Sequence, residues 1–176
     1  MLLYLTDRAM ENFSLCQYAR IILSNTIAEP KRCNKMQNFD KSSITVSVIV
    51  HAPVEKVWAS WTDPQHITQW NHASDDWHTP KAENDLRAGG TFSYRMEARD
   101  GSFGFDFGGE YTQVRTYEKI AFSLGDGRKV EVLFSASVSE TIITETFEAE
   151  SLNSYEKQKA GWQAILNNFK KYTEGI

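Results

Sequence analysis

Hydrophobic and polar positions alternate along the chain from Ile44 onward. In "ITVSVIV", the aliphatic side chains at every second position up to Val50 share one side, which predicts a strand with one buried face. The stretch over 53–61 instead carries its apolar residues at helical spacing and predicts a short helix. Asp63 before Pro64 is a typical helix start, so "PQHITQW" is expected to form a second short helix.

Further alternating stretches follow, with turn sequences between them. The expected strands are "WHTPKAE", "TFSYRME", "FGFDFGGEYTQV", "KIAFSL", "KVEVLFSASV" and "TIITETFEAE". The Asp-Gly pairs in "RDGS" and "GDG" are typical of hairpin turns, so neighbouring strands are expected to be antiparallel. Pro80 predicts an edge position for the first of these strands, because proline has no N–H to donate within a sheet. Gly108 and Gly109 predict a bulge or sharp bend in the third.

The end of the chain, "EKQKAGWQAILNNFKKYTE", predicts a long amphipathic helix. Its apolar stripe follows helical spacing through Trp162, Ile165, Leu166, Phe169 and Tyr172. The helix is expected to start near Asn153, with Glu156 completing a capping arrangement, and Gly161 predicts a close approach or slight bending. The element order predicts an α+β fold, in which a curved antiparallel sheet of about six to seven strands surrounds the long C-terminal helix.

Residues 1–35 do not share this pattern. "ENFSLCQYARIILSNT" shows a poor helical pattern, and "AEPKRCNK" has the composition of a linker. Two explanations stay open: either Met36 is the native start and 1–35 arise from an early start assignment, or 1–35 form a genuine helical extension. In both cases the folded domain is expected to span 36–176.

Composition narrows the classes of function. A chain of 176 residues suits one domain, and 41% hydrophobic residues supply a substantial core. The formal net charge of -4 argues against binding nucleic acid, which needs a basic surface. No apolar run is long enough to span a membrane. Because Cys16 and Cys33 do not make a disulfide framework, a reducing, cytoplasmic location is expected.

Several stretches together carry a family resemblance. They are "VIVHAPVEKVWASWTDPQHITQW", "DLRAGGTFSYRM", "DGSFGFDFGGEYTQV", "EKIAFSL", "DGRKVEV", "TETFEAE" and "GWQAILNNFKKYTE". Over residues 43–174 the chain resembles the START-like superfamily of helix-grip proteins, also called SRPBCC or Bet v-like. Within it, the chain is similar to the branch related to the C-terminal domain of the heat-shock protein 90 ATPase activator. The superfamily includes lipid carriers, hormone-binding proteins, polyketide cyclases and chaperone-binding domains, so the resemblance implies a fold more than a function.

The resemblance also implies a deep, largely apolar cavity between the last helix and the sheet. From the residues alone, a solid aromatic core is the simpler account; the resemblance favours a cavity. The residues then expected to line it are Trp70, Trp77, Phe92, Tyr94, Phe105, Phe107, Phe122, Phe134, Phe147, Trp162, Ile165, Leu166 and Phe169. Trp70 and Trp77 flank the loop "NHASDD", where they either gate the cavity or anchor a surface loop.

Candidate catalytic chemistry is sparse. Glu145 shares strand parity with Phe147, so its carboxyl is a candidate acid or base if that face points inward. Pairing of Glu145 with Arg95 or Arg128, or a strand face that points the other way, is the simpler account.

The remaining polar candidates favour structural roles. His66, His72 and His78 match no spacing typical of metal ligands, so neither a metal nor another cofactor is expected. Arg87 is expected to pair with Asp85 rather than with a ligand.

Three functions stay in competition at this point. The first is binding of a small apolar or aromatic molecule in the cavity, for sequestration or transport. The second is a cyclase- or hydrolase-like enzyme that uses the same cavity, and it is less favoured because no oriented pair of catalytic groups stands out. The third is a domain that contacts a chaperone or another protein partner.

Overall fold

The computed structural model describes residues 42–176, so the expectations for 1–35 lie outside the described part. The strands are β1 (Ser43–Val50), β2 (Trp77–Asn84), β3 (Thr91–Ala98), β4 (Gly104–Arg115), β5 (Lys119–Leu124), β6 (Lys129–Ala136) and β7 (Thr141–Glu148). The helices are α2 (Val54–Thr62), α3 (Pro64–Trp70) and α4 (Tyr155–Gly175). This order confirms the predicted α+β fold, with two short helices after the first strand.

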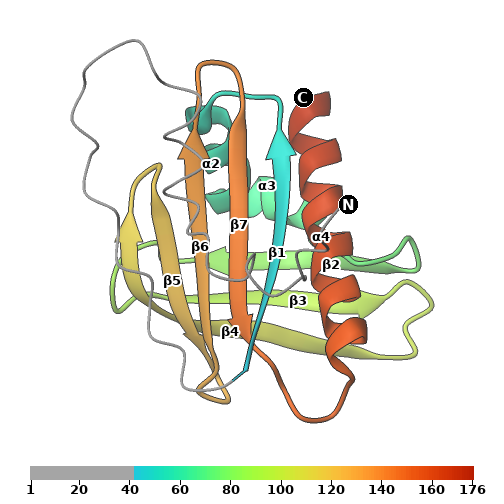
Figure 1. The fold of residues 1–176 in the computed structure, drawn as a ribbon. Coiled ribbons are helices and arrows are strands. Elements are labelled where there is room, and N and C mark those ends of the chain that lie inside the picture. Colours follow the sequence, from blue (N-terminus) through green and yellow to red (C-terminus); the bar gives the residue numbers. More distant parts are fainter. Residues whose placement is uncertain (1–41) are drawn as a thin grey trace, which may run out of the picture. The chain divides into compact units, whose positions relative to one another are not determined.

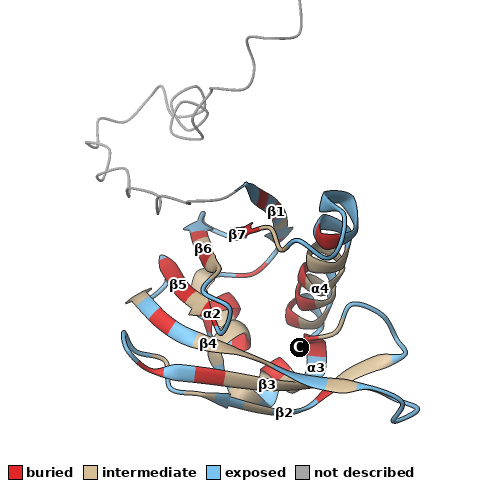
Figure 2. Ribbon diagram, turned by 90° about the horizontal axis from the view of Figure 1, so that it is seen from below, coloured by how far each residue is buried: buried red, intermediate tan, exposed pale blue. Residues whose placement is uncertain are grey.

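The strands form one antiparallel sheet in the order β1-β7-β6-β5-β4-β3-β2. Hairpins join successive strands from β2 to β7, and β1 closes the arrangement by pairing with β7. The sheet is strongly curled: β1, β7, β6 and β5 run across the direction of β2, β3 and β4 (Figure 1). Seen from below, the curl surrounds one side of α4 (Figure 2), which confirms the helix-grip arrangement.

The first strand and the short helices form as their patterns predict. On β1, Ile44 and Val50 are fully buried, and the strand pairs with β7 through Phe147 at its far end. Asp63 caps α3, because its Oδ1 accepts a hydrogen bond from the Gln65 backbone N–H at 2.8 Å. The short helices contribute Trp61 and Trp70 to the cavity described below.

The edge position of β2 is also confirmed. Its pairing with β3 shifts register between His78 and Lys81, on either side of Pro80. The shift lets the strand accommodate a residue that has no backbone N–H to donate.

The predicted bulge in β4 is displaced along the strand. Gly108 and Gly109 pair in regular register with β3, and the irregularity lies between Tyr111 and Gln113. The glycines serve another purpose: a Cβ on Gly108 would lie 2.7 Å from the Phe92 carbonyl oxygen. They allow the close approach of the neighbouring strands β3 and β5.

The start of α4 also differs from the prediction by one residue. Ser154 is the N-cap, and its hydroxyl accepts a hydrogen bond from the Lys157 backbone N–H at 3.3 Å. Asn153, expected in that role, instead donates from its side-chain amide to Glu150 Oε1 at 2.7 Å. No helix within residues 42–176 is long and apolar enough to cross a membrane.

Candidate functional site

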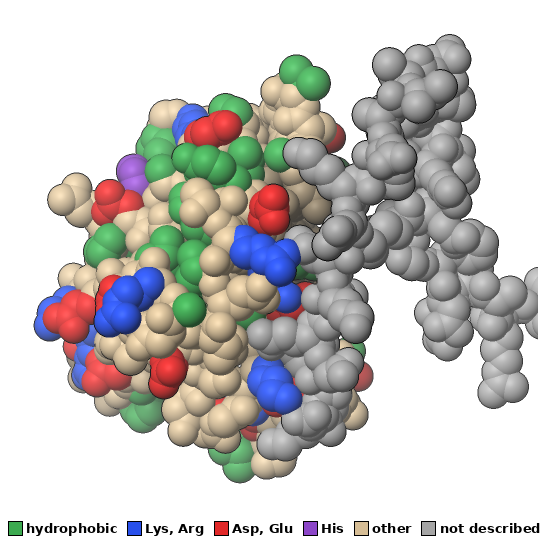
Figure 3. Space-filling view, turned by 90° about the vertical axis from the view of Figure 1, so that its left-hand side faces the viewer, with side chains coloured by type: hydrophobic (Ala, Val, Ile, Leu, Met, Phe, Trp, Pro, Cys, Tyr) green, Lys and Arg blue, Asp and Glu red, His purple; other side chains and the backbone are tan. Residues whose placement is uncertain are grey.

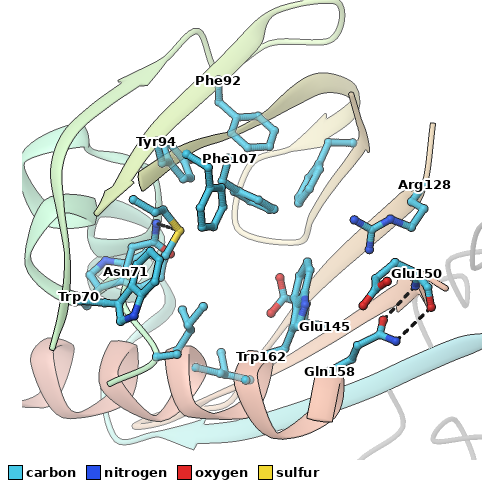
Figure 4. A pocket seen from close by; sticks show the side chains of 18 of the residues that line it. Trp70, Asn71, Phe92, Tyr94, Phe107, Arg128, Glu145, Glu150, Gln158 and Trp162 are labelled. Atoms are coloured by element: carbon cyan, nitrogen blue, oxygen red, sulfur yellow. Dashed lines mark hydrogen bonds between the residues drawn. The ribbon is translucent and has the colours of Figure 1, made fainter. Parts of the chain in front are cut away.

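A cavity of about 730 Å³ lies between α4 and the curled sheet. This volume falls within the range of about 300–1,000 Å³ that is typical of small-molecule sites. Aromatic rings from β3, β4 and β5 form one wall, and the apolar stripe of α4 forms the opposite wall (Figure 4). The side chains of residues 42–176 therefore leave the space between helix and sheet partly unfilled.

Most of the residues predicted to line the cavity do face it. Those at the wall are Trp70, Trp77, Phe92, Tyr94, Phe105, Phe107, Phe122, Trp162, Ile165 and Leu166. Their assignment to ligand binding stays a prediction, but the structure brings them to one hollow. Phe92 lies at the centre of the sheet wall, with its ring 5.0 Å from Tyr94 and 4.9 Å from Phe122 between centroids.

The other three predicted residues, Phe134, Phe147 and Phe169, do not line the cavity. They lie behind the lining residues Trp61 and Trp162, whose rings cover them. Phe147 is fully buried and stacks on Trp162, with centroids 3.9 Å apart and planes 13° apart. Phe169 is fully buried against Trp61, and Phe134 packs edge-on against the same indole. They hold the lining rings in position and form the solid part of the core.

The two tryptophans that flank the loop before β2 have different roles. Trp70 is only 4% exposed, and its indole N–H donates to the Ser60 carbonyl at 3.0 Å, so it is a fixed wall rather than a gate. Trp77 packs against Phe103 and Phe105, which are 62% and 41% exposed. These three rings mark a part of the lining that reaches the surface.

Glu145 on β7 points into the cavity beside Trp162 (Figure 4). The residue is 7% exposed, and no hydrogen bond or ion pair to the described residues reaches its carboxyl. Burial alone raises the pKa of this carboxyl from 4.5 to about 8, because nothing offsets the loss of hydration of the charged form. At neutral pH the carboxyl is therefore mainly protonated.

The simpler account of Glu145, a pairing with an arginine, is wrong. The Arg95 guanidinium contacts Glu97 at 2.7 Å and Asp106 at 3.6 Å. Arg128 Nε donates to the Asp126 carboxylate at 2.7 Å. Both arginines pair with carboxylates of their own hairpins, and neither forms an ion pair with Glu145.

A pair of tyrosines provides the second polar feature of the sheet wall. The Tyr111 hydroxyl donates to Asn84 Oδ1 at 2.8 Å, and the Asn84 amide donates to the Thr62 carbonyl at 2.6 Å. Burial raises the pKa of Tyr111 to about 12, and burial beside Tyr111 raises the pKa of Tyr94 above its usual range. Both phenols therefore stay neutral at physiological pH.

A polar cluster closes the cavity at the start of α4. Gln158 accepts a hydrogen bond from the Glu150 N–H at 2.9 Å and donates to the carbonyls of Glu150 and Asn153 (Figure 4). The side chains of Arg128 and Lys157 also line this end. The cavity thus has an aromatic centre and one polar end.

Gly161 on α4 opens the cavity rather than allowing close contact. A Cβ at this position would meet no atom within 4 Å, so the predicted close approach of a neighbour is wrong. The residue lines the cavity between the polar end and Trp162. Its missing side chain adds to the empty volume.

The other candidate residues have structural partners. Arg87 pairs with Asp85 at 2.9 Å, as expected. The histidines do not share a partner: His66 contacts the Tyr172 hydroxyl at 2.7 Å, and His78 lies 3.8 Å from Glu97. Within the described part of the chain, no three His, Cys, Asp or Glu side chains come together as metal ligands.

Charges of both signs are intermixed on the face shown in Figure 3. Lys and Arg side chains there lie beside Asp and Glu side chains, with hydrophobic groups between them. That face is unlike the continuous basic surface that phosphate binding needs.

Comparison with known proteins places the chain in a family. Residues 51–174 match the family model of the activator of Hsp90 ATPase homolog 1-like protein. The chain belongs to this family. An AHSA1-like protein from Aeromonas hydrophila, solved by NMR, is 43% identical over 75% of this chain and 93% of its own, with a TM-score of 0.70. Chr148 from Cytophaga hutchinsonii is 53% identical over 76% of this chain and 92% of its own, with a TM-score of 0.67.

More distant structures share the fold alone. CV1439 from Chromobacterium violaceum is 20% identical over 76% of this chain and 98% of its own, with a TM-score of 0.68. No curated protein matches the chain. Membership of the AHSA1-like family confirms the resemblance found in the sequence, and it is consistent with a domain that binds a ligand or a protein partner.

Three lining residues of this AHSA1-like domain were not among those predicted, although the sequence contains a signal for each. Gln158 and Gly161 extend the stripe of Trp162 and Ile165 by one helical turn toward the start of α4. Neither residue is hydrophobic, so the apolar pattern of the helix does not identify them as lining residues. Tyr111 also lines the cavity, at the same strand parity as Phe107.

Proposed function

We propose that this protein binds a small, mainly apolar molecule in the cavity between α4 and the sheet, for sequestration or transport. The observation that carries the proposal is the volume of about 730 Å³ that remains between two walls of rings and aliphatic groups. Transfer of apolar surface from water into such a hollow favours binding by about 25 cal/mol per Å², before ordering costs.

The shape of the lining suggests a flat ligand body. Phe92, Phe107 and Phe122 present rings from three adjacent strands, and Trp162 faces them from α4. Because Phe147 stacks under Trp162, the indole is held in one orientation. Rings held in this way favour other flat apolar groups through stacked and edge-on contacts.

The enzymatic alternative lacks a specific supporting observation. A general acid or base works with a partner that orients it, and the Glu145 carboxyl has no hydrogen bond or ion pair with any described residue. The partner-binding alternative rests on the family match and on the exposed rings of Phe103 and Phe105. Neither alternative is supported as directly as the cavity.

The test is to fill the cavity without disturbing its walls. Gly161→Phe places a ring in the open space at this position, and Gly161→Ala is the matched control that adds one methyl group. Binding of the fluorescent apolar probe 1-anilinonaphthalene-8-sulfonate, and of 2-ethylnaphthalene by equilibrium dialysis, is measured on all three proteins. We expect Gly161→Phe to lose at least about 90% of the affinity that wild type and Gly161→Ala share.

Equal binding by Gly161→Phe and wild type, with Gly161→Phe folded by circular dichroism, would place the bound probes outside the cavity. That result would refute the proposal.

A further inference from the structure

We propose that Glu145 is the polar anchor of the cavity, and that its ligand is an uncharged molecule whose carbonyl oxygen accepts a hydrogen bond from the Glu145 carboxyl. This inference rests on the proposed function and adds a chemical class to it. Glu145 is the β7 residue that lines the cavity, and its carboxyl has no hydrogen-bond or ion-pair partner within residues 42–176.

The geometry around Glu145 leaves its carboxyl available to a ligand. Its neighbours across the sheet are Val46 on β1 and Val132 on β6, both buried and unable to form a side-chain hydrogen bond. On the cavity side it lies beside Trp162 (Figure 4). A buried polar group without a partner costs stability, and a ligand that supplies the partner recovers that loss.

The other charged groups of the lining form no ion pair with Glu145. Arg128, from the start of β6, is paired with Asp126, and Glu150, in the loop after β7, accepts from Asn153. Lys157 on α4 lies in an exposed first turn. None of these supplies the charge compensation that a Glu145 carboxylate would need, since burial is the only cause of its raised pKa.

The titratable groups of the opposite wall stay neutral. They are Tyr94 on β3 and Tyr111 on β4, and burial raises the pKa of both phenols. Because that wall carries no charge at neutral pH, the carboxyl faces aromatic rings and neutral hydroxyls. A protonated carboxyl in such surroundings has one O–H to donate, and a ligand carbonyl is the matching acceptor.

A cationic amine is the competing ligand class. Its charge would need Glu145 to ionise, and the pair would sit in a cavity where both ions lose their hydration. Aromatic faces attract cations, so the experiment below includes a cationic probe beside the ketone.

The experiment uses three probes with the same naphthalene body. These are 2-acetylnaphthalene, which has a carbonyl, 2-ethylnaphthalene, which is apolar, and 2-naphthylmethylamine, which is cationic. Dissociation constants are measured by equilibrium dialysis at about pH 6 for wild type, Glu145→Gln and Glu145→Leu. The ratio of ketone to ethyl affinity reports the hydrogen bond, because the shared body cancels.

We expect Glu145→Leu to lower this ratio about tenfold, whereas Glu145→Gln, which keeps an N–H donor, retains it within about threefold. At about pH 9.5 the ketone-to-ethyl ratio of wild type should also fall, because the carboxylate no longer donates. The ratio for Glu145→Gln should not change. The pH comparison needs only wild type and Glu145→Gln, so it stands even if Glu145→Leu does not fold.

Two outcomes would overturn the inference while leaving the proposed function intact. One is a ketone-to-ethyl ratio that neither Glu145→Leu nor high pH changes. The other is an amine whose affinity falls most on Glu145→Leu, which would make this a cation site. Failure of wild type to bind any of the three probes would instead count against the proposed function itself.

Discussion

Glu145→Gln is expected to remove a loss of stability that wild type suffers as the pH rises. In the described part of the folded chain, Glu145 is 7% exposed and its carboxyl has no hydrogen bond or ion pair, so burial raises its pKa from 4.5 to about 8. The unfolded chain releases this proton near pH 4.5, whereas the folded chain keeps it until about pH 8. Between these values ionisation favours the unfolded state, so the free energy of unfolding falls as the pH rises.

The size of the effect follows from the two pKa values. Each pKa unit corresponds to about 1.4 kcal/mol, so the rise from 4.5 to about 8 amounts to about 5 kcal/mol in total. About 3 kcal/mol of this is lost by pH 7, and the loss is complete above about pH 8. Water entering the cavity would hydrate the carboxylate, so about 5 kcal/mol is an upper bound.

Urea unfolding of wild type and Glu145→Gln, followed by circular dichroism from about pH 5 to about pH 9, measures the difference directly. Glutamine has the same shape and does not titrate, so the two proteins should differ least at the acidic end and most at the basic end. Glu110→Gln, at an exposed position on β4, is the control and should follow wild type. The reasoning fails if the difference between wild type and Glu145→Gln is the same at every pH.

Three further substitutions test the packing around the cavity, each by urea unfolding. Gly161→Ala should stabilise the protein by about 0.5–1 kcal/mol, because alanine is the better helix former and its Cβ meets nothing; a loss of stability would contradict the open space. Phe147→Ala should cost about 3–5 kcal/mol and release the Trp162 indole, seen as altered near-UV dichroism, and an effect below about 1 kcal/mol would refute its role as platform. Gly109→Ala should cost at least about 1–3 kcal/mol, since its Cβ would overlap the Ser123 carbonyl oxygen, and a neutral result would exclude that close approach.

Much of this fold follows from periodicity. The alternation in β1 and the stripe in α4 each have one buried face, so pattern and structure agree element by element. The local errors arose where side-chain chemistry competes over one or two positions. Ser154 and Asn153 are both good caps, and only the Glu150 carboxylate, which holds Asn153 in the preceding loop, decides between them.

The displaced bulge in β4 has a similar cause. Glycines at 108 and 109 are compatible with a bulge, a bend or a close approach, and the sequence does not distinguish these. The structure places Phe92 and Ser123 on the neighbouring strands against the two glycines, so close approach decides. That information depends on which strands pair, and no single stretch of sequence contains it.

The cavity was less predictable than the fold, because parity gives the direction of a side chain and not the distance to the atom it faces. Parity brought Phe92, Phe107 and Phe147 to one side of the sheet, yet only the first two reach the hollow. Phe147 is covered by Trp162, which stacks directly on it. A single layer of rings therefore separates the core residue Phe147 from the cavity.

The identities of two lining residues, Gly161 and Glu145, favour a ligand-binding role for the cavity. Gly161 lies inside a long helix, where alanine would be more stable and would meet no obstacle. Glu145 lies between Val46 and Val132 of neighbouring strands, where an apolar side chain would avoid an unpartnered buried carboxyl. Departures from the stabilising choice are expected at functional sites, where binding compensates for their cost. Both departures occur on the wall of the same cavity. One enlarges the cavity, and the other adds a carboxyl that has no hydrogen-bond partner among the described residues. This coincidence favours a cavity built for a ligand over an imperfectly packed core.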